Sequence, residues 1–598
     1  MTDDKRDKWR RLPKVSFNHK DIKKRMRKVE TATIKHAHKF VIKRWGNVRE
    51  VQRRVVLWIL AVGLLIAATG LQLMWYQQGY RTTATGTDGT YAEAVLGPVD
   101  TLNPLFASSS AEKATSYLMF SRLLNYDNTG HLGYDLVSNI RVNDTKTVYT
   151  ISIRPDVKWH DGFDLTAKDV IFTIGLIQNQ NTRSTISGWT DINAKLINDT
   201  TFELTLKSTY AAFEHALTFP ILPKHILGEV SPSNIRENSF SQDPIGSGPF
   251  KLRFVQDADS SSGHKIIYMA KNEDYYSGIV KLSRFQLHIY DTNDAILHAL
   301  SINEVNAAAD LSIFDIDSVD TKRYDVSSKS IQSGVYAILN TQSALLKDNA
   351  LRRVLQQATN TNEIRDKFST KVTSLDLPFT NGQLTGNVPT VMPFDQGKAI
   401  KMLDDNGWKL NGQNVREKDG KPLKLSIVTI KDDELEKVLE LLVGQWRAIG
   451  IVIDTKVIDL SDVSQNAVQN VLQSRNYDVL LYRLNIGADP DVYAYWHSSQ
   501  ISTQGYNFAN YSNVISDDAL SSARTRVEPA LRNAKYITFA KQWINDVPAI
   551  GLYQSTAQYV NSNNVKSFNG SNVLVSPVDR YGDVVNWSVG NKNVYKTP

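Results

Sequence analysis

Residues 149–170 read YTISIRPDVKWHDGFDLTAKDV, and this stretch carries the densest structural signal in the chain. Its first residues alternate between apolar and polar side chains, as half-buried strands do. An Asp-Gly pair at Asp161 makes a tight turn, and Thr166 with Asp169 has the spacing of a helix capping box. The stretch therefore predicts a strand, a turn and a helix. His160 stands beside Asp161, and we interpret the pair as packing and turn chemistry rather than as an acid–base pair.

Strand and helix patterns also alternate in the second half of the chain. Lys424–Ile430 alternates like a strand, Asp433 and Glu436 have capping-box spacing, and Ile451–Ile458 is typical of a second strand. The helical pattern between the two strands ends at Gly450. Two strands joined through a helix form a parallel crossover. The chain is therefore predicted to be a mixed α/β protein.

The size and composition of the chain indicate a globular protein with several lobes. The 598 residues are 41% hydrophobic and 22% charged, and they exceed what one hydrophobic core usually serves. The chain has no cysteine. This excludes disulfides, thiol catalysis, cysteine-ligated metals and attachment through a lipidated cysteine.

The net charge of +7 is unevenly distributed along the chain. Residues 1–54 hold about 19 Lys and Arg against 6 Asp and Glu, which leaves the rest of the chain near −6. Because nucleic-acid binding needs a basic surface, the main body is not expected to bind nucleic acid. We interpret the basic segment as a solvated cytoplasmic tail. An amphipathic helix at Ile22–Ile42 on an anionic membrane surface is the alternative.

One apolar run interrupts this polar N-terminal region. Val55–Tyr76 (VVLWILAVGLLIAATGLQLMWY) contains no charged residue and would span about 33 Å as a helix. The arginines before it are Arg44, Arg49, Arg53 and Arg54. Positive charge on this side predicts a transmembrane anchor with a cytoplasmic N-terminus, followed by a linker at residues 77–90. A cleaved signal peptide is the competing interpretation, but its apolar region is shorter and its basic leader does not run for about fifty residues.

A second informative stretch, Asp243–Leu252, reads DPIGSGPFKL and predicts a glycine-rich turn before a strand. It is not a phosphate loop, because the Lys-Ser/Thr pair is missing and Pro249 has no N–H. Ser247 lacks the spacing of a nucleophile elbow. The acids that begin at Asp257 imitate a calcium loop but lack its glycine and its glutamate. A hairpin with Gly263 at the turn is the better interpretation.

Further short segments occur through most of the chain in the order seen in one known family. They are TLNPLFA at Thr101, ILPKHIL at Ile221, KNEDYYSG at Lys271, LRRVLQQATN at Leu351, GKAIKMLDDNGW at Gly397 and YDVLLYRLNIGADPDVYAYW at Tyr477. With the two stretches above, the chain resembles the peptide/nickel class of extracytoplasmic substrate-binding proteins of ABC importers. These are the family 5 solute-binding proteins, which include oligopeptide and dipeptide receptors. One departure is Asn303-Glu-Val-Asn306, where that family usually has Gly-Glu-x-Asp.

The resemblance implies an α/β, bilobal, periplasmic-binding-protein-like (type II) fold with an extra third lobe, preceded by the transmembrane helix. Lobe I would comprise residues 91–117, 223–319 and 549–598. Lobe II would comprise residues 118–222, and lobe III residues 320–548. Lobes of this kind close over a ligand by a hinge movement.

The resemblance also implies where a ligand would bind. In peptide-binding relatives, the extended ligand bonds to one loop and one strand, whose counterparts here are Ser108, Ser109 and Ser110 and then Leu484 and Asn485. Peptide receptors commonly carry an aspartate four positions before the proline that corresponds to Pro490. This chain has Ile486 there, so the usual anchor for a ligand amine is absent.

Arg483 stands where relatives usually have tryptophan. A cation in a cleft needs an acidic partner, which is either a ligand anion or an internal carboxylate such as Asp489 or Asp491. We expect a cleft that does not depend on a free ligand amine and that favours an anionic or N-blocked group. An internal partner for Arg483 would remove that expectation.

The predicted function is that of a membrane-anchored, extracytoplasmic solute-binding component. It would capture an oligopeptide or a related elongated solute and deliver it to ABC permease subunits, without catalysis. A peptide-binding receptor or envelope chaperone that is not coupled to transport is the alternative. No cofactor and no metal are expected, because the eleven histidines show no ligand spacing and cysteine is absent. A hydrolase is disfavoured because no Ser/His/Asp order, zinc signature or catalytic carboxylate pair stands out.

Overall fold

The computed structural model describes residues 45–85, 89–259, 263–460, 466–568 and 573–595. The chain forms two units, one of residues 1–84 with 592–598 and the other of residues 85–591. The predicted cytoplasmic tail before residue 45, including the alternative helix at Ile22–Ile42, lies outside the described residues.

The smaller unit contains the helix α2 (Trp45–Tyr80) and a two-stranded sheet of β1 (Arg81–Thr85) and β23 (Asn591–Tyr595). β1 falls within the linker that the sequence predicts at residues 77–90, so this part of the segment forms a strand. The partner strand comes from the other end of the chain, and local composition does not reveal such a distant partner.

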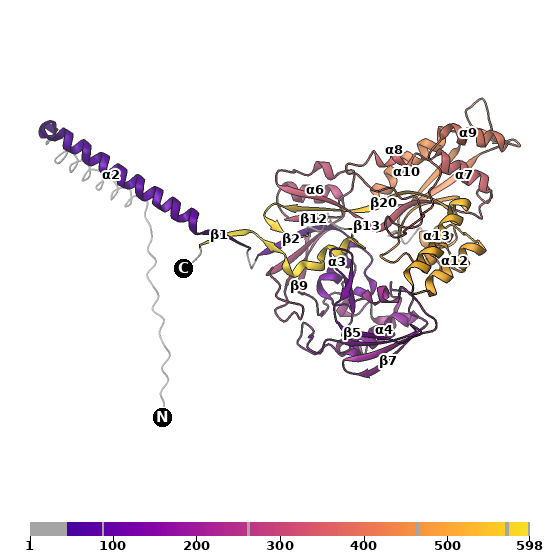
Figure 1. Ribbon diagram of the computed structural model, residues 1–598, viewed down its shortest axis with the longest axis horizontal. Coiled ribbons are helices and arrows are strands. Elements are labelled where there is room, and N and C mark those ends of the chain that lie inside the picture. The colour runs from indigo at the N-terminus through magenta and orange to yellow at the C-terminus, as the bar shows by residue number, and fades with distance from the viewer. Residues whose placement is uncertain (1–44, 86–88, 260–262, 461–465, 569–572, 596–598) are drawn as a thin grey trace. The chain divides into compact units, whose positions relative to one another are not determined.

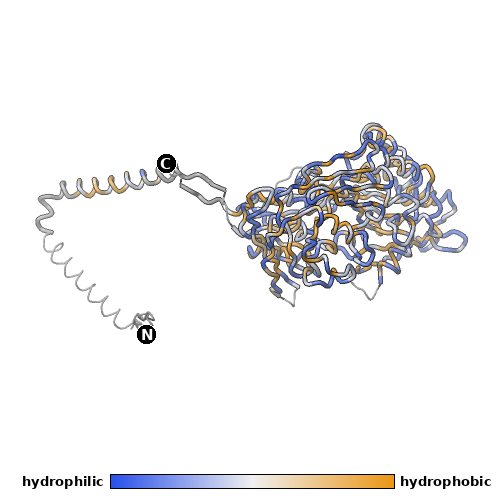
Figure 2. The backbone as a smooth tube through the Cα atoms, turned by 90° about the horizontal axis from the view of Figure 1, so that it is seen from below, coloured by the Kyte–Doolittle hydropathy of each residue, from blue (hydrophilic) through white to orange (hydrophobic). Residues whose placement is uncertain are grey.

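Helix α2 carries exposed apolar side chains between Val56 and Leu71. Figure 2 colours the backbone of hydrophobic residues in this helix orange. Within the residues that the structure describes, no helix has both the length and the apolar character needed to cross a membrane. The transmembrane span Val55–Tyr76 stays a prediction.

A ten-stranded mixed sheet runs through the larger unit (Figure 1). Its strands follow the order β18-β17-β19-β13-β20-β12-β2-β11-β10-β9. Their bounds are β2 (Thr90–Leu96), β9 (Phe250–Asp259), β10 (His264–Lys271), β11 (Arg284–Tyr290), β12 (Ala307–Ala309), β13 (Tyr324–Leu339), β17 (Lys424–Ile430), β18 (Val452–Ile458), β19 (Val479–Asn485) and β20 (Ala549–Ser562). Neighbouring strands come from distant parts of the sequence, so this region does not divide into consecutive domains.

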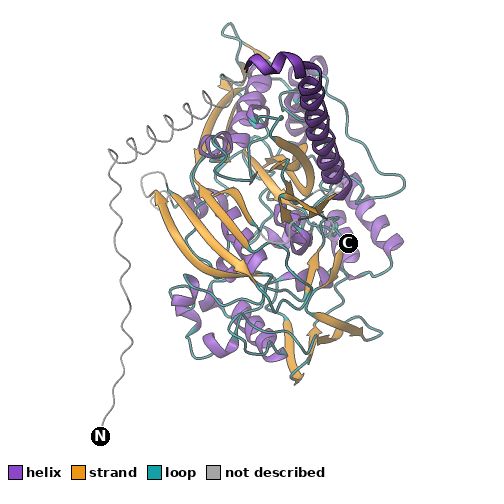
Figure 3. Cartoon of the chain, turned by 90° about the vertical axis from the view of Figure 1, so that its left-hand side faces the viewer, coloured by secondary structure: helices purple, strands orange, loops and turns teal. Residues whose placement is uncertain are grey.

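The long strands β13 and β20, which are labelled in Figure 1, connect the two halves of this sheet. Figure 3 shows all the described strands in orange. They pair antiparallel, with an interruption between Ser330 and Gly334. On one side of the interruption β20 also pairs with β12, and on the other side β13 also pairs with β19. The interruption therefore separates two groups of strands that share the same two connecting strands.

Helices cover both faces of the sheet around β13. The helices of the larger unit are α3 (Ser110–Met119), α4 (Ala167–Gln178), α5 (Lys224–Leu227), α6 (Asn293–Ser301), α7 (Asn349–Ala358), α8 (Thr361–Arg365), α9 (Gln396–Asp405), α10 (Asp433–Arg447), α11 (Tyr493–Trp496), α12 (Val514–Thr525) and α13 (Pro529–Asp546). Val335 and Ala337 share an apolar cluster with α7, α9 and α10, whereas Tyr336 and Ile338 share another with α12 and α13. Successive side chains of a strand point to opposite faces, so both faces are buried here, as in α/β proteins.

Residues 118–222 contain a separate antiparallel sheet in the order β5-β6-β8-β7. Its strands are β5 (Val137–Val142), β6 (Val148–Ile153), β7 (Ile192–Asn198) and β8 (Thr201–Leu206). As predicted from residues 149–170, strand β6 leads through a turn into α4, and the carboxylate of Asp169 accepts the N–H of Thr166 at 2.8 Å. Short pairs complete the fold: β3 (Leu124–Tyr126) with β4 (Leu132–Tyr134), β14 (Lys409–Leu410) and β16 (Lys421–Pro422) with β15 (Arg416–Lys418), and β21 (Val565–Lys566) with β22 (Ser588–Val589).

The two informative stretches of the sequence bond to each other through His160. Its Nδ1 accepts the N–H of Gly246 at 3.2 Å, and its Nε2 donates to the carbonyl of Gly248 at 3.1 Å. A Cβ at either glycine would collide with the backbone of Met119. His160 is therefore structural, as interpreted from the sequence. The predicted hairpin joins β9 to β10, with Gly263 at φ +67° in the turn.

The predicted crossover is confirmed, since β17 and β18 are parallel neighbours joined through α10. The helix cap is Asp432, whose side chain accepts the N–H of Leu435 at 3.0 Å, rather than the expected Asp433. Only Asp433 has a glutamate three residues later, but an aspartate can cap a helix without that glutamate, and the path of the backbone places Asp432 at the cap position.

Candidate ligand-binding cleft

A cleft of about 640 Å³ opens between the two groups of strands of the ten-stranded sheet. Its volume lies within the range of roughly 300–1,000 Å³ that small-molecule sites occupy. The walls come from both sides of the β13 interruption and consist of Leu96, Gly97, Ser110, Asp291–Asn293, Asp310–Ser312, Ile331, Lys431–Glu434, Asp459, Arg483, Ser555–Gln558 and Pro577. Ser110 and Arg483 are the two sequence-predicted site residues among them.

The lining of this cleft is predominantly acidic. Its carboxylates are Asp291, Asp310, Asp432, Asp433, Glu434 and Asp459, and its cations are Lys431 and Arg483. A cleft lined by one sign of charge concentrates ligands of the opposite sign. The cleft therefore favours a ligand that carries a positive group.

Arg483 is paired inside the protein with the first turn of α10 and its cap. Its Nη2 donates to Glu434 at 3.0 Å, and its Nη1 lies 3.6 Å from a carboxylate oxygen of Asp432. Burial alone would lower the pKa of Arg483, but the charges of Glu434 and Asp432 outweigh it and hold this pKa above its usual value. The prediction that Asp489 or Asp491 is the internal partner of Arg483 is wrong. Pairing of β17 with β19 brings the start of α10 over the arginine, and sequence spacing does not show this.

Asp489 and Asp491 have other arginine partners. Asp489 accepts two hydrogen bonds from Arg532, at 2.7 and 2.6 Å. Asp491 accepts from Nε of Arg524 at 3.1 Å, and burial raises the pKa of its carboxyl group. Neither residue lines the cleft, and their arginine partners lie on the helices α12 and α13. Both carboxylates are therefore paired inside the protein and are not partners of Arg483.

The three predicted serines have different surroundings. Ser109 caps α3, because its hydroxyl accepts the N–H of Glu112 at 3.1 Å. The carboxylate of Glu112 in turn accepts the N–H groups of Ser108 and Ser109, at 2.7 and 3.1 Å. Burial would raise the pKa of Glu112, but its backbone hydrogen bonds lower it. These hydrogen bonds within the loop hold Ser108 and Ser109 in place. Ser110 lies beyond this cap and lines the cleft.

Leu484, Asn485 and Ile486 occupy the end of β19 and the residue after it. Leu484 and Ile486 are buried in an apolar cluster, while Asn485 is exposed. Leu484 and Asn485 pair with Gly334 and Ser333 of β13. The side chains of Leu484 and Ile486 therefore serve packing, whereas that of Asn485 is exposed.

Asp310 is a cleft residue that the sequence does not single out. Its backbone has φ +64°, which is unusual for a residue other than glycine. Its Oδ2 is buried and has no hydrogen-bond partner among the described residues. Burial raises the pKa of this carboxyl group, although the nearby Arg580 acts in the opposite direction. A strained, partly unsatisfied acid in a cleft is typical of a binding residue, and no linear motif marks it.

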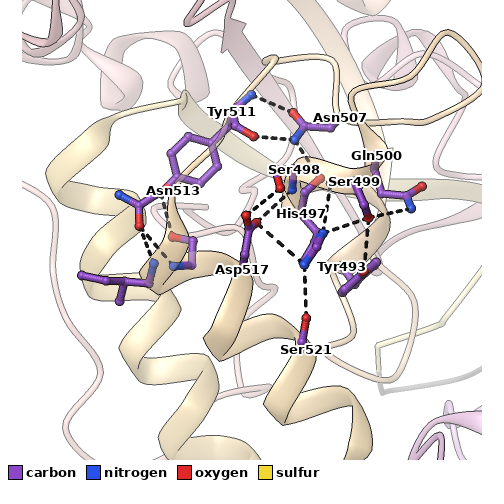
Figure 4. Close-up of polar contacts among 12 residues, drawn as sticks. Tyr493, His497, Ser498, Ser499, Gln500, Asn507, Tyr511, Asn513, Asp517 and Ser521 are labelled. Carbon is purple, nitrogen blue, oxygen red and sulfur yellow. Dashed lines mark hydrogen bonds and ion pairs between the residues drawn. The ribbon is translucent and has the colours of Figure 1, made fainter. Parts of the chain in front are cut away.

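Serine, histidine and aspartate side chains also meet around His497 (Figure 4). Its Nε2 lies 3.1 Å from Oγ of Ser521 and 3.9 Å from an oxygen of Asp517, while its Nδ1 accepts the N–H of Ser499 at 3.1 Å. In a catalytic triad the carboxylate holds one ring nitrogen and leaves the other free to take the serine proton. Here Nε2 carries the proton and faces both groups, so the cluster cannot activate Ser521.

The sheet, its shared connecting strands and the charged cleft define a bilobal α/β binding protein with a periplasmic-binding-protein-like fold. The structure of the oligopeptide-binding protein AppA from Bacillus subtilis in complex with a nonapeptide has a TM-score of 0.72 and 22% identity, over 85% of this chain and 100% of that one. NikZ from Campylobacter jejuni in complex with Ni(L-His) has a TM-score of 0.71 and 25% identity, over 83% and 99%.

The sequence comparisons lead to the same class of protein. Residues 131–507 match the model of bacterial extracellular solute-binding proteins, family 5. The chain is 25% identical over 479 residues to the oligopeptide-binding protein AppA of Bacillus subtilis, covering 77% of this chain and 84% of that protein. The chain therefore belongs to family 5 of the bacterial extracellular solute-binding proteins. Its relatives are binding proteins, which agrees with the prediction that it is not an enzyme.

Proposed function

We propose that this protein is the solute-binding component of an ABC importer for oligopeptides or related elongated solutes, and that it passes its ligand to permease subunits. Family membership and the oligopeptide-binding relatives support the assignment. The ligand class is inferred from the acidic cleft, in which Glu434 already neutralises the charge of Arg483. Such a cleft suits a free peptide amine, which brings a positive charge and hydrogen-bond donors.

The ligand amine is proposed to bind at Asp310. The buried Oδ2 of this residue lacks a hydrogen-bond partner within the described part of the chain, and a ligand ammonium group would supply one. This proposal replaces the expectation of an anionic or N-blocked ligand. That expectation required a free Arg483, and the charge of this residue is taken by Glu434 and Asp432.

The ligand backbone is proposed to lie along the end of β19. The ladder between β17 and β19 covers Val479–Leu481, so the residues from Tyr482 to Asn485 have no described strand beside them on that side. Extended peptides bind by adding a strand to such an edge. Leu484 and Asn485 would contribute backbone groups, and the loop of Ser108, Ser109 and Ser110 would face the ligand through Ser110.

The lobes are proposed to close by bending at the interruption between Ser330 and Gly334, where β13 leaves its register with β20. Hinges are short segments that absorb a change in backbone angles. The division into residues 91–117, 223–319 and 549–598, residues 118–222 and residues 320–548 is retained as a proposal. On this view the hinge lies within β13, about ten residues beyond the expected boundary at 320.

Val55–Tyr76 is proposed to anchor the protein in the cell membrane, with a cytoplasmic N-terminus and the larger unit outside. The uncharged run, the arginines before it and the exposed apolar side chains of α2 support this placement. A high-salt wash should leave the full chain in the membrane fraction, since salt weakens surface electrostatics but not a spanning helix. Release by salt, or a mature N-terminus after about residue 80, would contradict the anchor.

No feature of the cleft favours the alternative of a receptor or chaperone without transport.

Calorimetry on the full chain in detergent tests the proposed ligand class. One nonapeptide is compared with its N-acetylated form, and the free-amine peptide is expected to bind about tenfold tighter or more, because a charge-assisted hydrogen bond contributes about 1.5–3 kcal/mol. Arg483→Ala should not weaken the free-amine peptide. Equal binding of the two forms would exclude an amine anchor. Failure to bind any peptide, with none co-purifying from the native cells by mass spectrometry, would overturn peptide binding.

A further inference from the structure

Two histidines and a glutamate meet on the larger unit outside the ligand-binding cleft. His264 begins β10, His288 lies within β11, and Glu304 follows α6. None of the three lines the cleft. The residues lie far apart in the sequence and show no motif, so the sequence predicts no metal here. The three donor atoms nevertheless lie within 4.8 Å of one another.

The antiparallel pairing of β10 and β11 places both imidazoles on one face of the sheet. Ile266 lies directly opposite His288, and His264 is two residues from Ile266. Side chains alternate along a strand, so all three point to the same side. Tyr290, two residues beyond His288, packs on this face against α6. The ring of His264 stacks on that of Tyr290 at 4.3 Å between centroids, which holds the first imidazole in place.

The end of α6 brings the carboxylate to the same face. Asn303 adopts φ +57°, and the N–H of Glu304 returns to the carbonyl of Ala299 at 2.9 Å. A left-handed residue after a helix reverses the direction of the chain. The carboxylate of Glu304 then lies 3.9 Å from Nε2 of His264 and 3.8 Å from Nδ1 of His288.

The separations among the three donor atoms fit a metal ion. The two imidazole nitrogens are 3.4 Å apart, and each is 3.8–3.9 Å from the carboxylate oxygen. A tetrahedral zinc ion with bonds of about 2.0–2.1 Å places its ligands about 3.3 Å from one another. A contraction of a few tenths of an ångström would therefore bring all three donors to bonding distance.

A second feature is typical of metal-binding histidines. The ring nitrogen of His288 that faces away from the cluster, Nε2, lies 3.3 Å from Oε1 of Gln286. Histidine ligands almost always donate their second N–H to a carbonyl or carboxylate, which fixes the tautomer and leaves the first nitrogen free to coordinate. His288 is only 5% exposed, whereas Glu304 is partly exposed and leaves a route for an ion.

We propose that His264, His288 and Glu304 form a binding site for a divalent transition-metal ion, with zinc as the best match. Two imidazoles and one carboxylate suit Zn²⁺, and Ni²⁺ and Cu²⁺ by the same donor chemistry. The three ligands come from β10, β11 and the end of α6, so an ion here would tie the helix to the sheet. The site is separate from the peptide cleft, and its existence does not depend on the proposed transport function.

Zinc titration of the tag-free, metal-stripped full chain in detergent tests the site. His264→Gln and Glu304→Gln should each weaken zinc binding at least about tenfold, since each removes a ligand. His298→Gln is the matched control, because His298 is an exposed histidine on α6 outside the cluster. This variant should bind zinc as the unaltered protein does, and Asp310→Asn should do the same.

Two further measurements keep the outcome decisive. Zinc should raise the melting temperature of the unaltered protein and of His298→Gln, but not that of His264→Gln. Cobalt should give the visible bands of a tetrahedral nitrogen and oxygen site, and the chain has no cysteine that could produce thiolate bands. Unchanged zinc affinity in both ligand variants, or no zinc binding by the unaltered protein, would overturn the proposal.

Discussion

The guanidinium of Arg524 lies 4.6 Å from the centroid of the Tyr210 ring. The carbonyl of the same arginine accepts the N–H of Ala211 at 2.9 Å, and its Nε donates to Asp491 at 3.1 Å. Tyr210 belongs to residues 118–222, which carry the separate sheet, and Arg524 lies on α12. One arginine thus joins two of the predicted lobes.

Arg524→Ala should shift the ligand-free protein toward an open form. The substitution removes the cation–π contact with Tyr210, which joins the two predicted lobes and contributes roughly 1–2 kcal/mol. We expect a larger radius of gyration by small-angle X-ray scattering and about tenfold weaker peptide binding, because binding then has to close the lobes at greater cost. Arg526→Ala, two residues along and exposed, is the control. Identical scattering from the two variants would show that Arg524 does not hold the lobes together.

Asp310→Asn should separate ligand affinity from stability. A free-amine peptide should bind about 10–100-fold more weakly, whereas its N-acetylated form should bind unchanged. The ligand-free variant should be at least as stable as the unaltered protein, because burial disfavours the charged carboxylate that it removes. Calorimetry and thermal melts measure the two effects.

The control for this substitution is Asp459→Asn. Asp459 lines the same cleft but is paired with Lys431 at 3.1 Å. The Asp459→Asn variant should therefore keep the preference for the free amine. Equal losses in the two variants would indicate a general effect of cleft charge rather than an anchor at Asp310.

Asp579 should make stability depend on pH. Burial raises the pKa of its carboxyl group to about 7, although hydrogen bonds and two arginines act against burial. Its native pKa exceeds the unfolded value of about 3.9, so the folded state binds the proton more tightly. This contribution to stability is complete below about pH 4 and is lost as the pH rises through about 7.

Asp579→Asn tests this dependence, because asparagine keeps an acceptor for the N–H of Ser576. The loss of stability between pH 4 and 7 should become smaller, and the variant should gain roughly 1–4 kcal/mol at pH 8. Urea unfolding across the pH range measures the free energy of unfolding, and the exposed Asp317→Asn is the control. A pH profile unaltered by Asp579→Asn would show that the carboxyl group titrates normally.

Gly246→Ala should destabilise the protein severely. A Cβ at this position would collide with the carbonyl of Met119, where the glycine-rich turn passes over the end of α3. Relief requires movement of the backbone, so we expect a loss of about 3 kcal/mol or more. Gly412→Ala meets no atom within 4 Å and should change stability by at most about 0.5 kcal/mol. Similar melting temperatures for the two variants would refute the close contact.

Most of the local architecture could be predicted from the sequence. The strand, turn and helix of residues 149–170, the βαβ crossover and the hairpin at Gly263 all follow from side chains within one turn or one strand of each other. The absence of cysteine and the uneven charge are likewise properties of composition. Local propensities and apolar periodicity act over these short distances, so a linear pattern records them.

Only the tertiary structure decided which charged groups remain available to bind a ligand or a metal ion. Arg483 pairs with Glu434 because β17 and β19 are neighbours in the sheet, although 49 residues separate the two side chains. The unpartnered oxygen of Asp310, the contact of Arg524 with Tyr210 and the cluster of His264, His288 and Glu304 arise in the same way. Electrostatic pairing and metal coordination act over a few ångströms of space and are indifferent to sequence distance, so the packing of the strands determines them.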